Sequence, residues 1–147
     1  MEVAHAILVA EDDANDIFFL RRAFQKAEVK TQILDVPNGQ EAIRYLQGTP
    51  PYNNRSDYPL PHVLLLDLKM PLMSGFDVLE WLQARPELAE LPALVLSSSA
   101  HEEDVSRARR LGARDYYVKP SDLTQLTQLA RELAAKWLSN KVLAGLP

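Results

Sequence analysis

A run of four apolar residues, Val63 to Leu66, is the feature that most limits the possible folds of this chain, and it ends on Asp67. A continuous apolar run of this length is typical of a strand buried on both faces, as in a parallel sheet. Residues 69–71 are Lys-Met-Pro, so the chain leaves the strand at once. Open α/β sheets bind their ligands outside the carboxyl ends of the strands. Asp67 lies at such an end, although this stretch alone fits a plain surface carboxylate equally well.

Other short apolar runs have the length of strands, and amphipathic segments separate them. The runs lie at residues 6–10, 31–36, 93–96 and 116–118. The segments at 14–27, 42–46, 75–82, 101–111 and 123–137 carry apolar residues at spacings of three and four, as helices do. This alternation favours an α/β fold, a doubly wound parallel sheet of five strands with helices on both faces. The second run is the least apolar, so we expect that strand at an edge.

The overall composition excludes several classes of protein. A chain of 147 residues suits one domain, residues 1–147, with its own core. A net charge of −4 offers no basic surface to a phosphate backbone, so nucleic-acid binding is not expected. The absence of cysteine excludes disulfides and thiolate metal sites. The chain has no signal peptide and no apolar run near the ~20 residues that span a bilayer, so we expect a cytoplasmic protein without membrane attachment.

Two segments do not follow the alternation of strands and helices. Residues 48–61 are rich in turn-forming residues and have no apolar period, so we interpret them as a loop insertion before the third strand. Tyr52, Arg55 and Tyr58 within this loop are candidates for a partner contact, but a solvated loop is favoured. Residues 138–147 are expected to extend the last helix.

Polar side chains follow the ends of four predicted strands. Glu11 and Asp12 follow the first strand, Asp67 the third, Ser97 the fourth and Lys119 the fifth. The carboxyl ends of parallel strands meet at one edge of a sheet, so we expect these side chains to converge. Clustered carboxylates repel one another, and a hard divalent cation such as Mg²⁺ relieves that repulsion. A carboxylate, a cation, a lysine and a hydroxyl around one cavity suit an incoming phosphoryl group.

At this point the sequence resembles the receiver domain of two-component response regulators. The motifs that carry the resemblance are Glu11-Asp12, Asp67-x-x-Met70-Pro71 with Gly75, Ser97, and Lys119-Pro120, in this order over nearly the whole chain. The family has the flavodoxin-like strand order 2-1-3-4-5, which the resemblance therefore implies here. Pro71 and Gly75 are expected to shape the loop after the third strand.

The resemblance implies a role for each acidic residue. Asp67 is expected to be the phosphoacceptor. Asp12 is expected to bind Mg²⁺ or Mn²⁺ directly, Glu11 to act mostly through water, and the main-chain carbonyl of Lys69 to complete the protein ligands. Asp13 is left as the N-cap of the first helix.

The resemblance also implies a switch. Ser97 is expected to bond the phosphoryl group, Lys119 to pair with it, and Tyr116 to turn inward when Ser97 moves. The Lys119–Pro120 peptide bond is expected to be cis, which would fix the direction of the lysine.

The function that follows is a single-domain response regulator, which accepts a phosphoryl group from a partner histidine kinase and signals through protein contacts. It is not an enzyme beyond its own phosphotransfer and autodephosphorylation. The chain looks like the small regulators that partner bacterial phytochromes, and we expect a homodimer through helix four, strand five and helix five. None of His5, His62 and His101 has the pairing of a metal site, so the phosphohistidine belongs to the partner.

Two alternatives remain open on the sequence. One is a docking module that works without phosphorylation. The other is a haloacid-dehalogenase-type phosphohydrolase, but that class needs a second Asp at the position of Lys69. We hypothesise instead that the Lys69 side chain overhangs the phosphoryl group and alters the rate of water attack.

Overall fold

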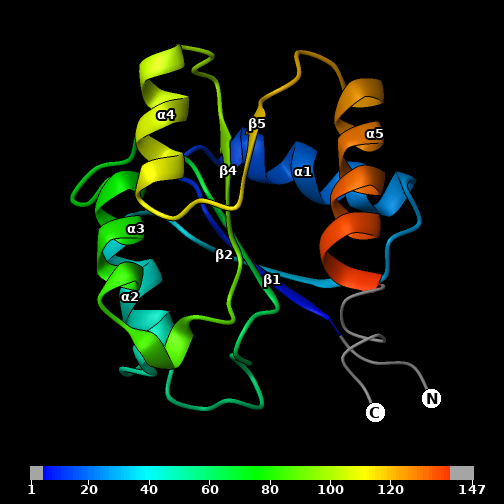
Figure 1. Ribbon diagram of the computed structural model, residues 1–147. Coiled ribbons are helices and arrows are strands. Elements are labelled where there is room, and N and C mark those ends of the chain that lie inside the picture. Colours follow the sequence, from blue (N-terminus) through cyan, green and yellow to red (C-terminus); the bar gives the residue numbers. More distant parts are fainter. Residues whose placement is uncertain (1–4, 140–147) are drawn as a thin grey trace.

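The computed structural model describes residues 5–139, which form a parallel sheet between two layers of helices (Figure 1). The strands are β1 (Ala6–Ala10), β2 (Gln32–Val36), β3 (Val63–Leu66), β4 (Ala93–Ser97) and β5 (Asp115–Val118). The α-helices are α1 (Ala14–Lys26), α2 (Gly39–Gln47), α3 (Gly75–Gln83), α4 (Glu102–Arg110) and α5 (Leu123–Ala134). A short 3₁₀ turn, η1 (Pro86–Leu88), follows α3, and a π-helical turn, η2 (Ala135–Ser139), follows α5.

The sheet has the order β2-β1-β3-β4-β5, and every neighbouring pair is parallel. This confirms the predicted order and the edge position of the second strand. Figure 1 shows α1 and α5 on one face of the sheet and α2, α3 and α4 on the other. The arrangement is the expected doubly wound α/β fold.

The continuous apolar runs are explained by the two helix layers. Successive side chains of a strand point to opposite faces, so a strand covered on both sides must be apolar at every position. Ile7, Val9 and Leu65 pack in the core under α1 and α5. Leu8 and Leu64 pack in the core under α2, α3 and α4.

Polar side chains fix the starts of the helices that flank the sheet's carboxyl edge. Asp13 accepts from the backbone N–H groups of Asn15 and Asp16 and so caps α1, as predicted. Ser74 and Asp77 form a reciprocal capping box at the start of α3. Asp122 caps α5. Each cap places a helix start next to the strand end from which the chain has just emerged.

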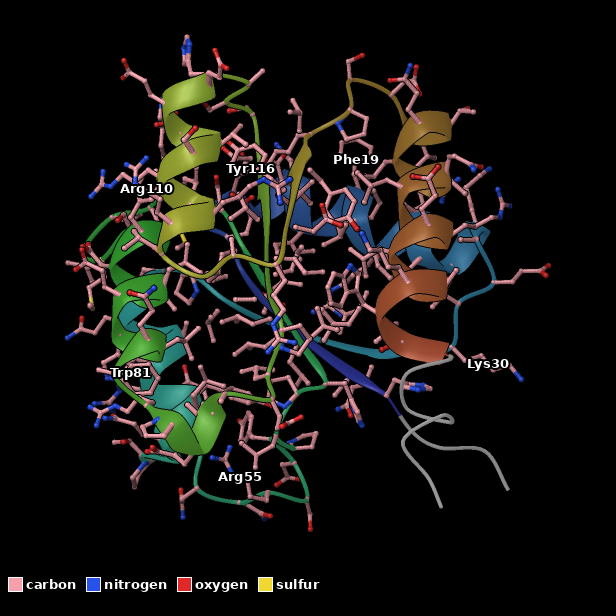
Figure 2. The ribbon with its side chains drawn as sticks, viewed as in Figure 1. Phe19, Lys30, Arg55, Trp81, Arg110 and Tyr116 are labelled. Atoms are coloured by element: carbon pink, nitrogen blue, oxygen red, sulfur yellow. The ribbon has the colours of Figure 1, made fainter. Side chains whose placement is uncertain are left out.

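The segment 48–61 packs against the domain, and the expectation of a solvated loop was wrong for its three large side chains. The rings of Tyr52 and Tyr58 lie 5.3 Å and 5.9 Å from that of Tyr45, which is 1% exposed. Arg55 donates to the carbonyls of Tyr45 and Leu46 in the last turn of α2, and also to Tyr58 (Figure 2). A guanidinium with five N–H donors thus adds charged donors at the end of a helix, where the last carbonyls run short of partners within the helix.

Two further expectations concern the end of the chain. The Lys119–Pro120 bond is not cis; among residues 5–139 the cis bond lies between Pro50 and Pro51. The trans form is the more stable one for most X-Pro bonds, and Lys119 reaches its carboxylate partners without the cis form.

The expected extension 138–147 falls largely outside the described residues. Within residues 5–139, no helix combines the length and hydropathy that crossing a membrane requires.

Replacing Arg55 with alanine is predicted to destabilise the domain by about 2 kcal/mol, because the carbonyls that it serves lose a charged donor. Urea denaturation followed by circular dichroism measures this. The exposed Arg22 on α1 supplies the control, since its replacement by alanine should change the unfolding free energy by less than about 0.5 kcal/mol. Equal effects of the two substitutions would contradict the capping role of Arg55.

Candidate functional site

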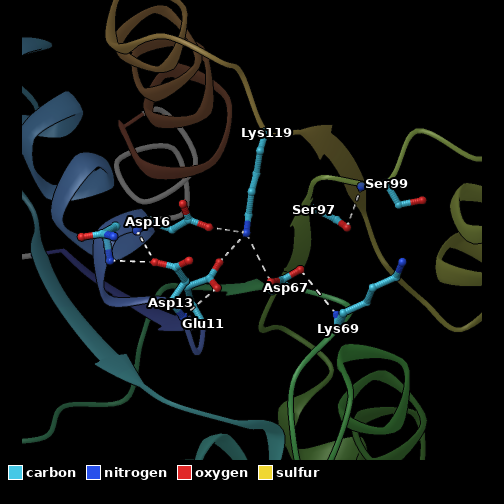
Figure 3. Close-up of polar contacts among 9 residues, drawn as sticks. Glu11, Asp13, Asp16, Asp67, Lys69, Ser97, Ser99 and Lys119 are labelled. Atoms are coloured by element: carbon cyan, nitrogen blue, oxygen red, sulfur yellow. Dashed lines mark hydrogen bonds and ion pairs between the residues drawn. The ribbon is translucent and has the colours of Figure 1, made fainter.

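The polar residues at the strand ends converge at the carboxyl edge of the sheet (Figure 3). Glu11 follows β1 directly, Asp67 follows β3, Ser97 is the last residue of β4, and Lys119 follows β5. Backbone hydrogen bonds continue past the strands and hold these residues in register. The N–H of Asp67 donates to the carbonyl of Ala10, and the N–H of Lys119 donates to that of Ser97. The predicted convergence is therefore a property of the sheet.

Three carboxylates form a group with the spacing of a cation site. Glu11, Asp12 and Asp67 each offer one oxygen, and these atoms all lie within 4.8 Å of one another. Glu11 and Asp67 are nearly buried, at 7% and 8% exposure, whereas Asp12 is exposed. Ligands that are all oxygen suit Mg²⁺ or Mn²⁺. The residues present therefore fit a hard divalent cation.

The Lys119 ammonium lies among the carboxylates. Its Nζ is 2.6 Å from Glu11 Oε1, 2.8 Å from Asp16 Oδ2 and 3.2 Å from Asp67 Oδ2. Sequence reasoning missed Asp16, which lies in the first turn of α1 and not at a strand end. Asp16 could have been found from its position three residues after the predicted cap Asp13, in the first turn of the helix that follows Glu11 and Asp12.

The electrostatics of the group follow from its burial. Burial raises the pKa of the Glu11 carboxyl to about 7, although the hydrogen bond from Lys119 opposes the rise. Burial lowers the pKa of Lys119, but its hydrogen bonds to Asp16 and Glu11 outweigh this, and the net pKa lies above its ordinary value. Lys119 is therefore charged at neutral pH. One ammonium does not balance the surrounding carboxylates, so the site favours a further cation.

A set of hydrogen bonds begins at Ser97, the last residue of β4, and runs through the loop that follows it. The N–H of Ser99 donates to Ser97 Oγ, and the Tyr116 hydroxyl donates to the Ser99 carbonyl at 2.7 Å. Ser99 Oγ donates in turn to Asp104 Oδ2, in the first turn of α4. The predicted pair Ser97 and Tyr116 is thus connected through Ser99. No motif in the sequence singled out Ser99 or Asp104.

Lys69 approaches Asp67 from another direction. Figure 3 shows Asp67 between Lys119 on one side and Ser97 and Lys69 on the other. The Lys69 N–H donates to Asp67 Oδ1 at 3.5 Å, and the Lys69 side chain is exposed. The hypothesis that the Lys69 side chain overhangs the phosphoryl group stays a prediction.

The first residue of α3, Gly75, has no room for a side chain. A Cβ atom there would lie 2.3 Å from the backbone carbonyl oxygen of Asp67. The Gly75 N–H also donates to the Leu68 carbonyl. The start of α3 is thereby pressed against the backbone of Asp67, which gives a physical basis for the structural role expected of Gly75.

The chain is similar to proteins of known class. A family model described as the response regulator receiver domain matches residues 7–131. The response regulator Rcp1 of Synechocystis sp. is 28% identical over 137 residues, which are 93% of this chain and 91% of that protein.

Solved structures give the same result in three dimensions. The response regulator RPA3017 in red light signalling of R. palustris has a TM-score of 0.87 at 29% identity, covering 92% of this chain and 94% of that one. The phosphorylated cyanobacterial phytochrome response regulator RcpA has a TM-score of 0.85 at 31% identity, covering 94% and 96%. The Mn²⁺-bound form of Rcp1 has a TM-score of 0.79 at 27% identity, covering 92% and 95%.

Replacing Gly75 with alanine is predicted to destabilise the domain by about 2 kcal/mol and to weaken Mn²⁺ binding about tenfold, because the Asp67 backbone must move. Calorimetric titration with Mn²⁺ and a thermal melt measure the two effects. Gly112 is the control: its φ of +104° makes Gly112→Ala cost about 1 kcal/mol, but a Cβ there meets only the Gln83 side chain. That variant should keep its Mn²⁺ affinity, and a loss equal to that of Gly75→Ala would contradict the local explanation.

Proposed function

The chain belongs to the response regulator receiver domain family, and we propose that it accepts a phosphoryl group on Asp67 and passes the signal on through protein contacts. The observation that carries the proposal is the position of Asp67. Its carboxylate shares the Glu11–Asp12–Asp67 group and lies 3.2 Å from the Lys119 ammonium. A nucleophile flanked by a cation site and a lysine suits a highly charged phosphoryl group.

The proposed cation is Mg²⁺ or Mn²⁺, held by Glu11, Asp12 and Asp67, with the main-chain carbonyl of Lys69 as a further ligand. The Mn²⁺-bound structure of the similar Rcp1 supports this. When bound, the cation neutralises charge on the phosphoryl oxygens and on the carboxylates that surround it. The burial of Glu11 and Asp67 makes this neutralisation worth more than it would be in water.

The transfer itself is a displacement at phosphorus. One carboxylate oxygen of Asp67 forms the new O–P bond while the P–N bond to the partner's phosphohistidine breaks, and the electron pair of that bond stays on the imidazole nitrogen. Lys119 and the Ser97 hydroxyl donate to phosphoryl oxygens. The product is an acyl phosphate on Asp67, and water attack on phosphorus returns the carboxylate and inorganic phosphate.

This chemistry favours a phosphoacceptor over a phosphohydrolase. A dehalogenase-type hydrolase uses a second aspartate two residues after the nucleophile as its general acid. Lys69 stands at that position, so the chain lacks the carboxyl group that this class of hydrolase uses there. The acyl phosphate therefore persists as a signal until water removes it.

The proposed phosphodonor is a histidine kinase of the phytochrome type. RPA3017 acts in red light signalling and RcpA is a phytochrome response regulator, and both resemble this chain over more than nine tenths of its length. The proposed output surface is the α4–β5–α5 face, through which we propose a homodimer. The hydrogen bonds of Ser99 support this choice because they connect Ser97 to Asp104 of α4 and to Tyr116 of β5.

Incubation with acetyl phosphate and Mg²⁺ is predicted to add one phosphoryl group, detected by intact-mass spectrometry. Asp67→Asn should abolish this addition, because an amide oxygen is a poor nucleophile, and so should removal of the cation with EDTA. A circular dichroism melt checks that the variant is folded. Phosphorylation of folded Asp67→Asn, or its persistence in EDTA, would contradict the proposed roles.

We propose that the Lys69 side chain overhangs the phosphoryl group and slows water attack. Replacing Lys69 with alanine is therefore predicted to shorten the lifetime of the phospho-aspartate about threefold, roughly 0.7 kcal/mol in the barrier. The decay of purified phosphoprotein, followed by released phosphate, measures this. Lys69→Met keeps the length of the side chain without its charge and should retain most of the wild-type lifetime. An unchanged lifetime in Lys69→Ala would refute the shielding role.

A further inference from the structure

Among the described residues 5–139, Asp16 is the carboxylate partner of Lys119 that lies outside the group Glu11, Asp12 and Asp67. Lys119 Nζ has contacts with Glu11, Asp16 and Asp67 at 2.6, 2.8 and 3.2 Å. An ammonium has three N–H donors, so these three carboxylates engage all of them. A phosphoryl oxygen can pair with Lys119 only if one of the carboxylates gives up its donor.

The three partners differ in how readily they release the lysine. Glu11 and Asp67 belong to the group that fits a divalent cation, and a cation there competes with Lys119 for their charge. Asp16 comes from the first turn of α1 instead, and its side chain is 42% exposed. A cation bound to the other two carboxylates does not compete for Asp16, so we expect the Asp16–Lys119 contact, drawn in Figure 3, to remain when that cation binds.

We infer that Asp16 is a positioning residue that holds the Lys119 ammonium away from the phosphoryl group and thereby lowers the affinity of the site for it. The inference rests on the proposed function, because it concerns the group that Asp67 accepts. Lys119 must leave Asp16, or share its donors with it, before it can pair with a phosphoryl oxygen. The exposure of Asp16 limits the strength of this competition, since half-exposed ion pairs are weak and correspond to about a two- to fivefold effect on an equilibrium.

The position of Asp16 also couples α1 to the end of β5. The Asp16–Lys119 pair joins the start of α1 to the residue that follows β5, and both residues line a cavity of about 260 Å³. Ile17 and Leu20 of α1 line that cavity together with Leu123 and Leu126 of α5. Transfer of Lys119 from Asp16 to a phosphoryl group therefore removes the ion pair that joins α1 to the end of β5.

Beryllofluoride, a stable stand-in for the phosphoryl group on an aspartate, tests the inference without any turnover. In saturating Mg²⁺, Asp16→Asn is expected to bind beryllofluoride about two- to fivefold more tightly than the wild type. Asp13→Asn is the matched control. It removes the same charge one turn away, and asparagine caps a helix as well as aspartate does, so its affinity should match the wild type. Mn²⁺ affinity measured in parallel should change less than twofold in both variants.

A double-mutant cycle separates the lysine from a general charge effect. In a Lys119→Met background, Asp16→Asn should no longer tighten beryllofluoride binding, because there is no ammonium to release. Lys119→Gln repeats the cycle with a polar side chain and serves if the methionine variant melts at a lower temperature.

The outcomes that overturn the inference are distinct. If Asp16→Asn and Asp13→Asn change the beryllofluoride affinity equally, the gain comes from the lost negative charge alone. If Asp16→Asn raises that affinity as much in the Lys119→Met background, the lysine is not involved. Wild-type protein that binds Mg²⁺ but not beryllofluoride would overturn the proposed function together with this inference. Wild-type binding with no gain in Asp16→Asn would overturn the inference alone.

Discussion

The concentration of negative charge at the carboxyl edge of the sheet is the constraint on which the site depends. Glu11 and Asp67 are both more than nine tenths buried, and removing an unpaired charge from water costs roughly several kcal/mol. Lys119 offsets part of that cost by contacting both carboxylates at once. The raised pKa of Glu11 shows that the compensation is incomplete. Affinity for a further cation is thus a consequence of how the carboxylates are buried.

The parallel sheet is what makes this burial possible. Strands covered by helices on both faces carry their polar residues only at their ends, and parallel strands bring those ends to one edge. The approach of Gly75 to the Asp67 carbonyl and the capping of α1 by Asp13 keep the helix starts close to the same edge. The features that stabilise the fold therefore also set the positions of the reactive groups. A substitution that adds a side chain at Gly75 or removes the cap at Asp13 is therefore expected to change the geometry of the acidic group.

The strands and helices were predictable from the sequence because each depends on a local pattern of apolar residues. The strand ends gave Glu11, Asp67 and Lys119, and the family resemblance gave the order of the strands. The sequence did not reveal the contacts between side chains of different elements. Asp16 meets Lys119 across 103 positions, and Arg55 caps α2 from a segment that has no periodic pattern. Such contacts depend on the directions of long side chains in the folded protein, which no local pattern encodes.

The two roles of Lys119 impose opposite demands on it. As the counter-ion of buried carboxylates it should be held tightly, and as a phosphoryl ligand it should be free to move. A lysine shared among three carboxylates meets both demands, because each contact contributes only part of the hold and the loss of one leaves the others in place. The exposed position of Asp16 matters in this balance. A fully buried third carboxylate would bind the ammonium too strongly to release it, whereas one that water reaches can exchange its ion pair for solvation at little cost.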